Sequence, residues 1–287
     1  MNLNSIRKVL FTNIVAEQLL LLCIKSNLFR GFFSKLLPGN ILYPKGTMRK
    51  ANRNGINYYL DISDYQAWLI YFMSDRDSSV NILNYLKDAT TILDIGANMG
   101  HTALEINKDR LSRIKNFSIT CFEPYPENFS MLQHNLTLNS TAHIQVENLG
   151  LGAEERLMKM YKDCDTNSGG NRIVYEPTKN TLDVEEVRVT SLDNYLNSKN
   201  INKVDFIKID VEGYEYEVLK GGIETLKTMK PRLFIELDNE NLKNQGSSAD
   251  ELISFLEQLG YSVSDAENKH DKNQLRTLNI HTDIYCE

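Results

Sequence analysis

The chain has 287 residues, of which 41% are hydrophobic and 24% are charged, and its formal net charge is -6 at pH 7. A net negative charge gives no general attraction to nucleic-acid phosphates, so no nucleic-acid partner is expected. The four cysteines are scattered without a Cys-x-x-Cys pair, which argues against a zinc site or a disulfide framework and for a reducing compartment. These properties are typical of a cytoplasmic enzyme.

The first segment of the chain is apolar but interrupted. Residues 9–24 are rich in leucine, isoleucine and valine, yet they include Asn13, Glu17 and Gln18, and a membrane-spanning helix needs about 20 apolar residues. No small-residue cleavage site follows, so a signal peptide is not expected. Residues 28–37 then mix aromatic and cationic side chains. Three interpretations stay open: packing on the catalytic domain, contact with a membrane surface, or docking onto a partner subunit.

The rest of the chain indicates one catalytic domain. Residues 1–50 are predicted to form an N-terminal helical extension, and residues 51–287 the domain itself. From residue 91 onward, short apolar runs alternate with segments of helical periodicity, including one helix predicted over residues 213–229. This alternation predicts an α/β fold with a doubly wound, mostly parallel sheet. Ligands of such sheets bind beyond the carboxyl ends of the strands.

A predicted strand at residues 91–95 leads into a turn that contains two glycines. Glycine lets a backbone approach a ligand where a Cβ would collide. The spacing does not match the G-x-G-x-x-G fingerprint of dinucleotide binding, and no phosphate-binding Gly-Lys-Ser/Thr is present. A ligand with an adenosine but no pyrophosphate fits better, and S-adenosylmethionine has this chemistry. The candidate cofactor residues at this turn are Asp94, Gly96, Ala97, Asn98 and Gly100.

A second cofactor contact is predicted where the next strand, residues 117–122, ends in Glu123 and Pro124. A carboxylate in this position can accept hydrogen bonds from both hydroxyls of a ribose. Its interval from the glycine turn is typical of a βαβ unit. The alternative is that Asp94 and Glu123 only cap the helices that follow them.

Acidic residues gather around the predicted strand at residues 204–209. Asp210 and Glu212 follow this strand two residues apart, and Glu236 lies near the end of the next one. Carboxylates crowded at one sheet edge repel unless they share a proton, a metal or a hydroxyl-rich ligand. We therefore interpret Asp210 as a candidate general base, with Glu212 or Glu236 orienting the acceptor. Glu212 at a helix N-terminus is the alternative, and His101 is a rival base.

A long polar segment separates two predicted strands. Residues 155–161 and 186–191 have the pattern of a hairpin, and residues 162–185 between them are polar and contain two glycines. Loops of this length in a compact domain are usually functional or disordered. A substrate lid and a plain mobile loop stay open as interpretations.

Five motifs of this chain occur together. They are Asp94-Ile95-Gly96-Ala97-Asn98-Met99-Gly100, Glu123-Pro124 with Asn135 and Asn139, Thr190-Ser191-Leu192-Asp193, Lys208-Ile209-Asp210-Val211-Glu212-Gly213-Tyr214-Glu215 and Leu219-Lys220-Gly221-Gly222. In this order they resemble the FkbM family of S-adenosylmethionine-dependent methyltransferases. The resemblance covers residues 55–240 and implies the class I methyltransferase fold, a Rossmann-like seven-stranded sheet whose last strand is antiparallel. It also implies that residues of the glycine turn surround the methionine end of the cofactor, that Glu123 binds the ribose, and that Asn148 lies near the adenine.

The expected activity is the transfer of a methyl group from S-adenosylmethionine to a hydroxyl of a sugar, a glycan or glycolipid, or a secondary metabolite. Two other functions stay open: a methyltransferase-like fold that only binds, and an NAD-dependent oxidoreductase, against which the missing third glycine counts. The expected partner is a small-molecule or glycan substrate. A divalent metal among the three carboxylates, self-association and peripheral contact with a membrane through the N-terminal segment are left open by the sequence.

Overall fold

The computed structural model describes residues 12–25, 32–33, 35–73, 79–161, 172–173, 184–277 and 279–287. The chain divides into two compact units, each described by itself below. The first comprises Met1–Asp77 with Asp165–Ser168, and the second Ser78–Cys164 with Gly169–Glu287. The boundary expected between residues 50 and 51 falls inside a strand of the first unit, Met48–Arg53. As a division between separately folding domains, it stays a prediction.

The first unit combines helices with one β-hairpin. Strands β1 (Met48–Arg53) and β2 (Ile56–Asp61) pair antiparallel through the two-residue turn Asn54-Gly55. Both turn residues have positive φ, 50° and 80°, as the tight turns favoured by twisted hairpins require. The other elements are the helix α2 (Ile14–Lys25), a short 3₁₀ helix (Asn40–Leu42) and α4 (Tyr65–Met73). Within the described part of the chain, no helix is both long and apolar enough to cross a membrane.

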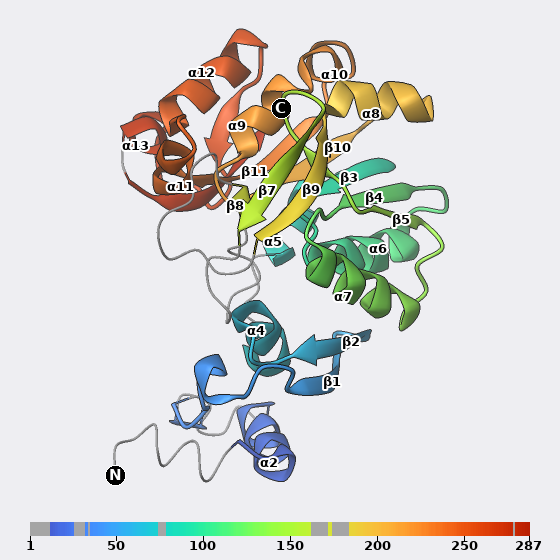
Figure 1. Ribbon diagram of the computed structural model, residues 1–287, viewed down its shortest axis with the longest axis vertical. Helices are drawn as coiled ribbons and strands as arrows, with labels where there is room; N and C mark the ends of the chain where they lie inside the picture. The colour runs from blue at the N-terminus through green and yellow to red at the C-terminus, as the bar shows by residue number, and fades with distance from the viewer. Residues whose placement is uncertain are drawn as a thin grey trace. The chain divides into compact units, whose positions relative to one another are not determined.

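The second unit is built on a seven-stranded sheet in the order β12-β13-β11-β10-β3-β4-β5 (Figure 1). Neighbouring strands are parallel from β11 to β5, whereas β13 runs antiparallel to both of its neighbours. This arrangement confirms the predicted doubly wound, Rossmann-like sheet with an antiparallel last strand. The strands are β3 (Thr91–Ile95), β4 (Ser118–Phe122), β5 (Ile144–Glu147), β10 (Phe206–Ile209), β11 (Arg232–Asp238), β12 (Val263–Asp265) and β13 (His281–Cys286).

Helices pack on this sheet, and its central strands are fully buried. Every residue of β10 is buried, and so are the last four residues of β3. Fully buried parallel strands require cover on both faces of a sheet. The helices of this unit are α5 (Ser79–Tyr85), α6 (His101–Arg113), α7 (Pro126–Thr137), α8 (Leu192–Lys199), α9 (Glu215–Lys220), α10 (Ile223–Thr228), α11 (Asn239–Asn244), α12 (Ala249–Gln258) and α13 (Lys272–Thr277).

The single helix predicted over residues 213–229 is wrong, because the segment forms two helices, α9 and α10. The break lies at Gly221 and Gly222. A Cβ on Gly221 would lie 1.9 Å from the Gly152 carbonyl oxygen, and one on Gly222 would lie 2.8 Å from Leu192. Close packing against these neighbours interrupts the helix, and the apolar periodicity of the sequence does not reveal it.

The segment between β5 and β10 forms a smaller, four-stranded sheet in the order β6-β9-β7-β8. Its strands are β6 (Gly150–Leu151), β7 (Arg156–Tyr161), β8 (Arg172–Ile173) and β9 (Val184–Thr190). The antiparallel pairing of β7 with β9 confirms the predicted hairpin. Apart from β8 and the start of β9, the candidate lid at residues 162–185 lies outside the described residues, so its function stays a prediction.

Candidate functional site

The turn after β3 has the backbone conformation that its glycines permit. Gly96, Asn98 and Gly100 have φ values of 81°, 45° and 88°. The N–H groups of Gly96 and Ala97 both donate to the Phe122 carbonyl oxygen at 3.0 Å, which ties the turn to the end of β4. The predicted cofactor turn therefore lies at the carboxyl ends of two adjacent parallel strands, where ligands of this fold class bind.

Packing against neighbouring protein atoms also requires glycine at two positions of this turn. A Cβ on Gly96 would lie 1.8 Å from the backbone oxygen of Asp210, and one on Gly100 would lie 2.4 Å from Leu132. Protein atoms thus occupy the space that a side chain would need. Gly96 allows the cofactor turn to pack directly on the end of β10. The close approach of these glycines to a ligand stays a prediction.

Glu123 joins the end of β4 to the same turn. Its carboxylate oxygens accept the N–H of Asn98 at 2.8 Å and the N–H of Tyr125 at 2.9 Å. Burial raises the pKa of Glu123 to about 7, although these N–H groups lower it. A carboxylate has about four acceptor positions, so Glu123 can accept a further hydroxyl while the backbone holds it. The residue fits the predicted contact with a ribose.

Asn148 and Pro124, the remaining predicted cofactor residues, are joined by a hydrogen bond in the structure. The side-chain amide of Asn148 donates to the carbonyl oxygens of Glu123 and Pro124, at 2.9 and 3.0 Å. These bonds fix the loop after β5 against the loop after β4. The contact of Asn148 with adenine stays a prediction, since its amide N–H groups are already engaged.

Lys208 is the functional residue that our sequence analysis did not single out. It lies in the buried strand β10, and its ammonium nitrogen is 3.1 Å from Asp210 Oδ2, 3.4 Å from Asp94 Oδ1 and 2.9 Å from the Gly96 carbonyl oxygen. Burial alone would lower the pKa of Lys208, but Asp210 and Asp94 raise it above its ordinary value. A lysine within an otherwise apolar buried strand was the signal, because such a charge requires carboxylate partners.

Asp94 is completely buried, and Lys208 is its ion-pair partner. Neither of its carboxylate oxygens has a hydrogen-bond partner among the described residues. Burial raises the pKa of Asp94, while Lys208 lowers it. Asp94 therefore pairs with Lys208, which also donates a hydrogen bond to the Gly96 carbonyl oxygen of the turn. Direct contact of Asp94 with the methionine end of a cofactor stays a prediction.

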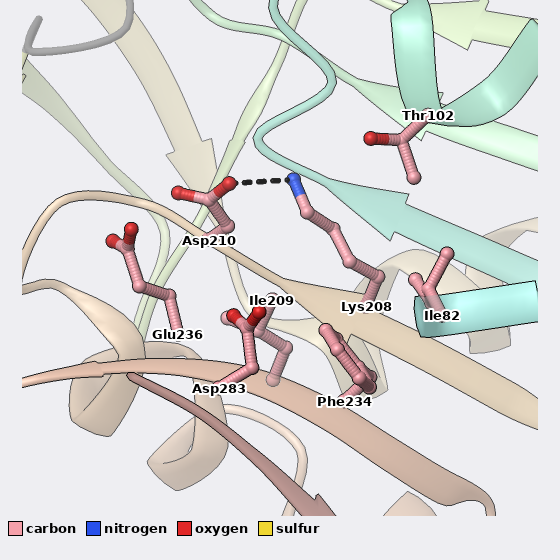
Figure 2. Close-up of a pocket in the computed structure, with 8 residues that line it drawn as sticks. All are labelled: Ile82, Thr102, Lys208, Ile209, Asp210, Phe234, Glu236 and Asp283. Atoms are coloured by element: carbon pink, nitrogen blue, oxygen red, sulfur yellow. Dashed lines mark ion pairs between the residues drawn. The ribbon is translucent and has the colours of Figure 1, made fainter. Parts of the chain in front are cut away.

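The three predicted catalytic carboxylates lie together. One oxygen from each of Asp210, Glu212 and Glu236 falls within 4.8 Å of the others. Asp283, on β13, faces Glu236 in the strand register and joins the group. Figure 2 shows Asp210 paired with Lys208, and Glu236 and Asp283 beside this pair. The pocket is lined by Ile82, Thr102, Lys208, Ile209, Asp210, Phe234, Glu236 and Asp283.

The electrostatics of these acids differ from those of Glu123. Burial, Asp210 and Glu212 all raise the pKa of Glu236, and one oxygen of Glu236 is buried without a hydrogen-bond partner in the described structure. Burial and the charge of Asp210 also raise the pKa of Asp283, to about 6. Oxygen ligands at this spacing could hold a hard divalent cation such as Mg²⁺. They could equally accept several hydroxyl groups.

Glu212 lies in a strained turn and does not line the pocket. Its φ is 54°, and its carboxylate accepts the side-chain amide of Asn241 at 3.0 Å. The N–H groups of Val211 and Gly213 bind Glu215 instead, each at 3.0 Å. Burial raises the pKa of Glu215 to about 7. The role at the start of the helix that we considered for Glu212 therefore belongs to Glu215.

His101, the rival base, begins α6. Its neighbour Thr102 lines the pocket, whereas His101 is absent from the described lining. The geometry thus favours the carboxylates over the imidazole.

Comparison with known proteins places these residues in a family. The family described as "Methyltransferase FkbM domain" matches residues 94–263, which include the glycine turn, Glu123 and the three carboxylates. The chain belongs to the FkbM methyltransferase family. This confirms the resemblance seen in the motifs. S-adenosylmethionine is the methyl donor of this family, so family membership confirms the cofactor prediction. Membership also disfavours the oxidoreductase alternative.

This chain is similar to two curated proteins. It is 28% identical to "Methyltransferase 1" of Beauveria bassiana over 151 residues, which are 47% of this chain and 59% of that protein. It is 29% identical to "Methyltransferase sdnD" of Sordaria araneosa over 194 residues, or 58% and 72% of the two chains. The chain thus spans about three fifths of the first relative's length.

A solved structure of a methyltransferase FkbM from Methylobacillus flagellatus KT is also similar. It shares 20% identity with a TM-score of 0.46, and the match covers 70% of this chain and 44% of that one. Our assignment to the family depends on the matched residues 94–263.

Proposed function

We propose that this FkbM family protein is an S-adenosylmethionine-dependent O-methyltransferase that methylates a hydroxyl of a sugar, a glycan or glycolipid, or a secondary metabolite. The observation that carries the proposal is the position of Asp210. Its backbone oxygen packs against Gly96 of the cofactor turn, and its side chain lines the pocket with Glu236 and Asp283. A carboxylate beside the turn that would hold the methyl donor suits an acceptor that must lose a proton.

The residues around the turn fit the donor. S-adenosylmethionine supplies an electrophilic methyl group on a sulfonium sulfur when it is bound. The segment from Gly96 to Gly100 would hold its methionine end, and Glu123 would accept hydrogen bonds from the ribose. Because the backbone already holds Glu123 through Asn98 and Tyr125, this acceptor is in place before the cofactor arrives.

Asp210 is the proposed general base. Lys208 holds one of its oxygens at 3.1 Å, which orients the carboxylate at the pocket. A positioned base that removes the proton of the acceptor hydroxyl accelerates such a transfer by typically about 10²–10⁴-fold. Glu236 and Asp283 would orient the acceptor by accepting its other hydroxyl groups.

The pocket lining supports a polyhydroxylated acceptor. Three carboxylates and a lysine provide polar contacts, and Phe234 and Ile82 provide an apolar surface. A sugar presents both features, since its hydroxyls bind carboxylates and its C–H faces pack on aromatic rings. Burial and the charge of Asp210 raise the pKa of both Glu236 and Asp283, and the hydroxyl groups of an acceptor would offer these acids hydrogen-bond donors.

The test is calorimetry with S-adenosylmethionine and S-adenosylhomocysteine, followed by a screen of labelled methyl transfer to free sugars, glycolipids and hydroxylated metabolites. We expect the wild type to bind both cofactors and Glu123→Ala to bind them at least about tenfold more weakly, as expected when a buried charged hydrogen bond is lost. The matched control is Glu224→Ala, which removes a carboxylate that is 72% exposed.

A wild-type protein that binds neither cofactor would contradict the proposal. Cofactor binding without methyl transfer to any hydroxyl would instead favour the binding-module alternative. Methyl transfer to a nitrogen or carbon acceptor would retain the enzyme class and overturn the O-methylation.

A further inference from the structure

Large apolar side chains are exposed mainly on the first unit. Of the nine exposed large hydrophobic residues in the described part of the chain, seven belong to this unit. The helix α2 carries four of them: Ile14 is 56% exposed, Val15 67%, Leu19 58% and Leu22 64%. Single exposed apolar residues are ordinary, whereas a group on one short element indicates an interaction site.

The four residues lie on one side of α2. At about 100° per residue, Ile14, Val15, Leu19 and Leu22 lie on one face of the helix, which also carries the exposed Gln18. The other face consists of Glu17, Leu20, Leu21 and Ile24, all of which are buried. Both faces are thus largely apolar, and the leucines and isoleucine of the second face are the buried ones.

Polar contacts fix which side of α2 faces outward. The buried Glu17 accepts two hydrogen bonds from the guanidinium of Arg49 on β1, at 2.7 and 2.9 Å. The side-chain amide of Gln18 donates to the hydroxyl of Tyr71 on α4 at 2.9 Å. Rolling the helix to hide its outer leucines would break the buried ion pair, which is strongly unfavourable. The apolar face is therefore held outward.

The charge of the chain is divided unequally. Residues 1–50 contain eight cationic side chains and one acidic one, a net charge of +7, while the remaining 237 residues carry 24 cationic and 37 acidic ones, a net charge of -13. The single acid of the first 50 residues is Glu17, which is buried and paired with Arg49. Lys35, Lys45 and Lys50 are exposed. Exposed cations thus belong to the same unit as α2.

We propose that the outer face of α2 docks this protein onto an anionic lipid surface. Exposed leucine, isoleucine and valine side chains enter the boundary between head groups and acyl chains, and neighbouring cations bind acidic head groups. The 12 residues of α2 span about 18 Å, so the helix lies along the surface. A second copy of the chain fits this face less well, because two segments of charge +7 repel each other.

The experiment measures co-flotation of the full chain with two kinds of vesicle, one of phosphatidylcholine alone and one of equal parts phosphatidylcholine and phosphatidylglycerol. We expect binding to the anionic vesicles, weakening at high salt because of screening. The double variant Leu19→Gln with Leu22→Gln should bind about tenfold more weakly. The matched control is Leu111→Gln with Leu157→Gln, two exposed leucines of the second unit, and it should bind within about twofold of wild type.

Three outcomes would overturn the proposal. One is no binding of the wild type to anionic vesicles, and another is equal loss of binding in both leucine pairs. The third is a change from dimer to monomer in the α2 variant, measured by sedimentation, which would assign the face to a second copy. Unchanged thermal unfolding of both variants shows that they fold. The inference is independent of the methyl acceptor, so it can fail while the proposed activity holds.

Discussion

Glu123 is a buried carboxylate and Glu236 a half-buried one, both near the carboxyl ends of strands in one sheet, and partial or full burial raises the pKa of each. Their surroundings act in opposite directions. Around Glu123, the N–H groups of Tyr125 and Asn98 lower the pKa that burial has raised. Around Glu236, the charges of Asp210 and Glu212 raise the pKa further. Backbone donors thus satisfy the Glu123 carboxylate, whereas negative charge accumulates around Glu236.

This difference indicates how the two sides recognise their ligands. Backbone donors hold Glu123 in one position, which suits a cofactor that is the same in every reaction cycle. Burial and the charge of Asp210 raise the pKa of Glu236 and of Asp283, so a hydroxyl-rich ligand or a cation would relieve the repulsion between these acids. Lys208 is the link, since its ammonium contacts the Gly96 carbonyl on one side and Asp210 on the other. The predictions below test that separation.

The largest effect is expected from Asp210→Asn. Loss of the proposed base should lower kcat by about 10²–10⁴-fold, while S-adenosylhomocysteine affinity changes little because the cofactor side stays intact. Steady-state kinetics and calorimetry measure the two quantities. The matched control is Glu212→Gln, because Glu212 accepts a hydrogen bond from Asn241 and does not belong to the pocket lining. This variant should lower kcat by less than about tenfold. A larger loss in Glu212→Gln than in Asp210→Asn would reassign the base.

The next effect concerns Lys208→Met, which breaks the link between the two sides. Removing one partner of a buried ion pair costs about 3–5 kcal/mol of unfolding free energy, because Asp94 and Asp210 lose their counter-charge. Urea denaturation measures this cost. The double variant Asp94→Asn with Lys208→Met should recover part of it, since the fully buried carboxylate is then neutral. No recovery would show that the ammonium serves Asp210 alone.

A smaller loss is expected for Gly96→Ala, which tests the packing of the cofactor turn on β10. Its φ of 81° costs an alanine about 1–2 kcal/mol, and the contact with the Asp210 backbone oxygen adds about 1–3 kcal/mol. Gly55→Ala is the matched control, because its φ is 80° and no atom lies within 4 Å of the new Cβ. If both variants lose the same unfolding free energy in urea denaturation, the cofactor turn can move away from β10. This result would contradict tight packing between the turn and that strand.

Much of this comparison could be predicted from the sequence, because it depends on residues next to one another in the chain. The glycine turn, Glu123 after β4 and the run from Lys208 to Glu215 are local patterns, and their strand-end positions follow from the alternation of strands and helices. The grouping of Asp210 with Glu236 also follows, since adjacent parallel strands end at the same edge of a sheet.

The parts that could not be predicted depend on register and packing. Asp283 joins the site because β13 pairs antiparallel with β11 and sets it opposite Glu236, and no local pattern specifies that register. The need for glycine at position 96 comes from the backbone of Asp210, more than 100 residues away in the chain. Glu215, and not Glu212, accepts the N–H groups of Val211 and Gly213. This depends on the positive φ values of Glu212 and Gly213 in the turn after β10. Lys208 could have been found, since its charge interrupts an apolar strand.

The smallest expected effect is a pH dependence that arises on the acceptor side. The pKa of Asp283 is raised from 3.8 to about 6, so the folded state binds its proton more tightly than the unfolded state does. The stability from this proton is complete below pH 4 and is lost as the pH rises through 6. Asp283→Asn should therefore flatten the fall in unfolding free energy between these values by about 1–2 kcal/mol, measured by urea denaturation. The control Asp250→Asn changes a carboxylate that is 61% exposed and should leave the slope as in wild type. If both variants keep the wild-type slope, Asp283 is not crowded by Asp210, and the contrast between the two sides then depends on Glu236 alone.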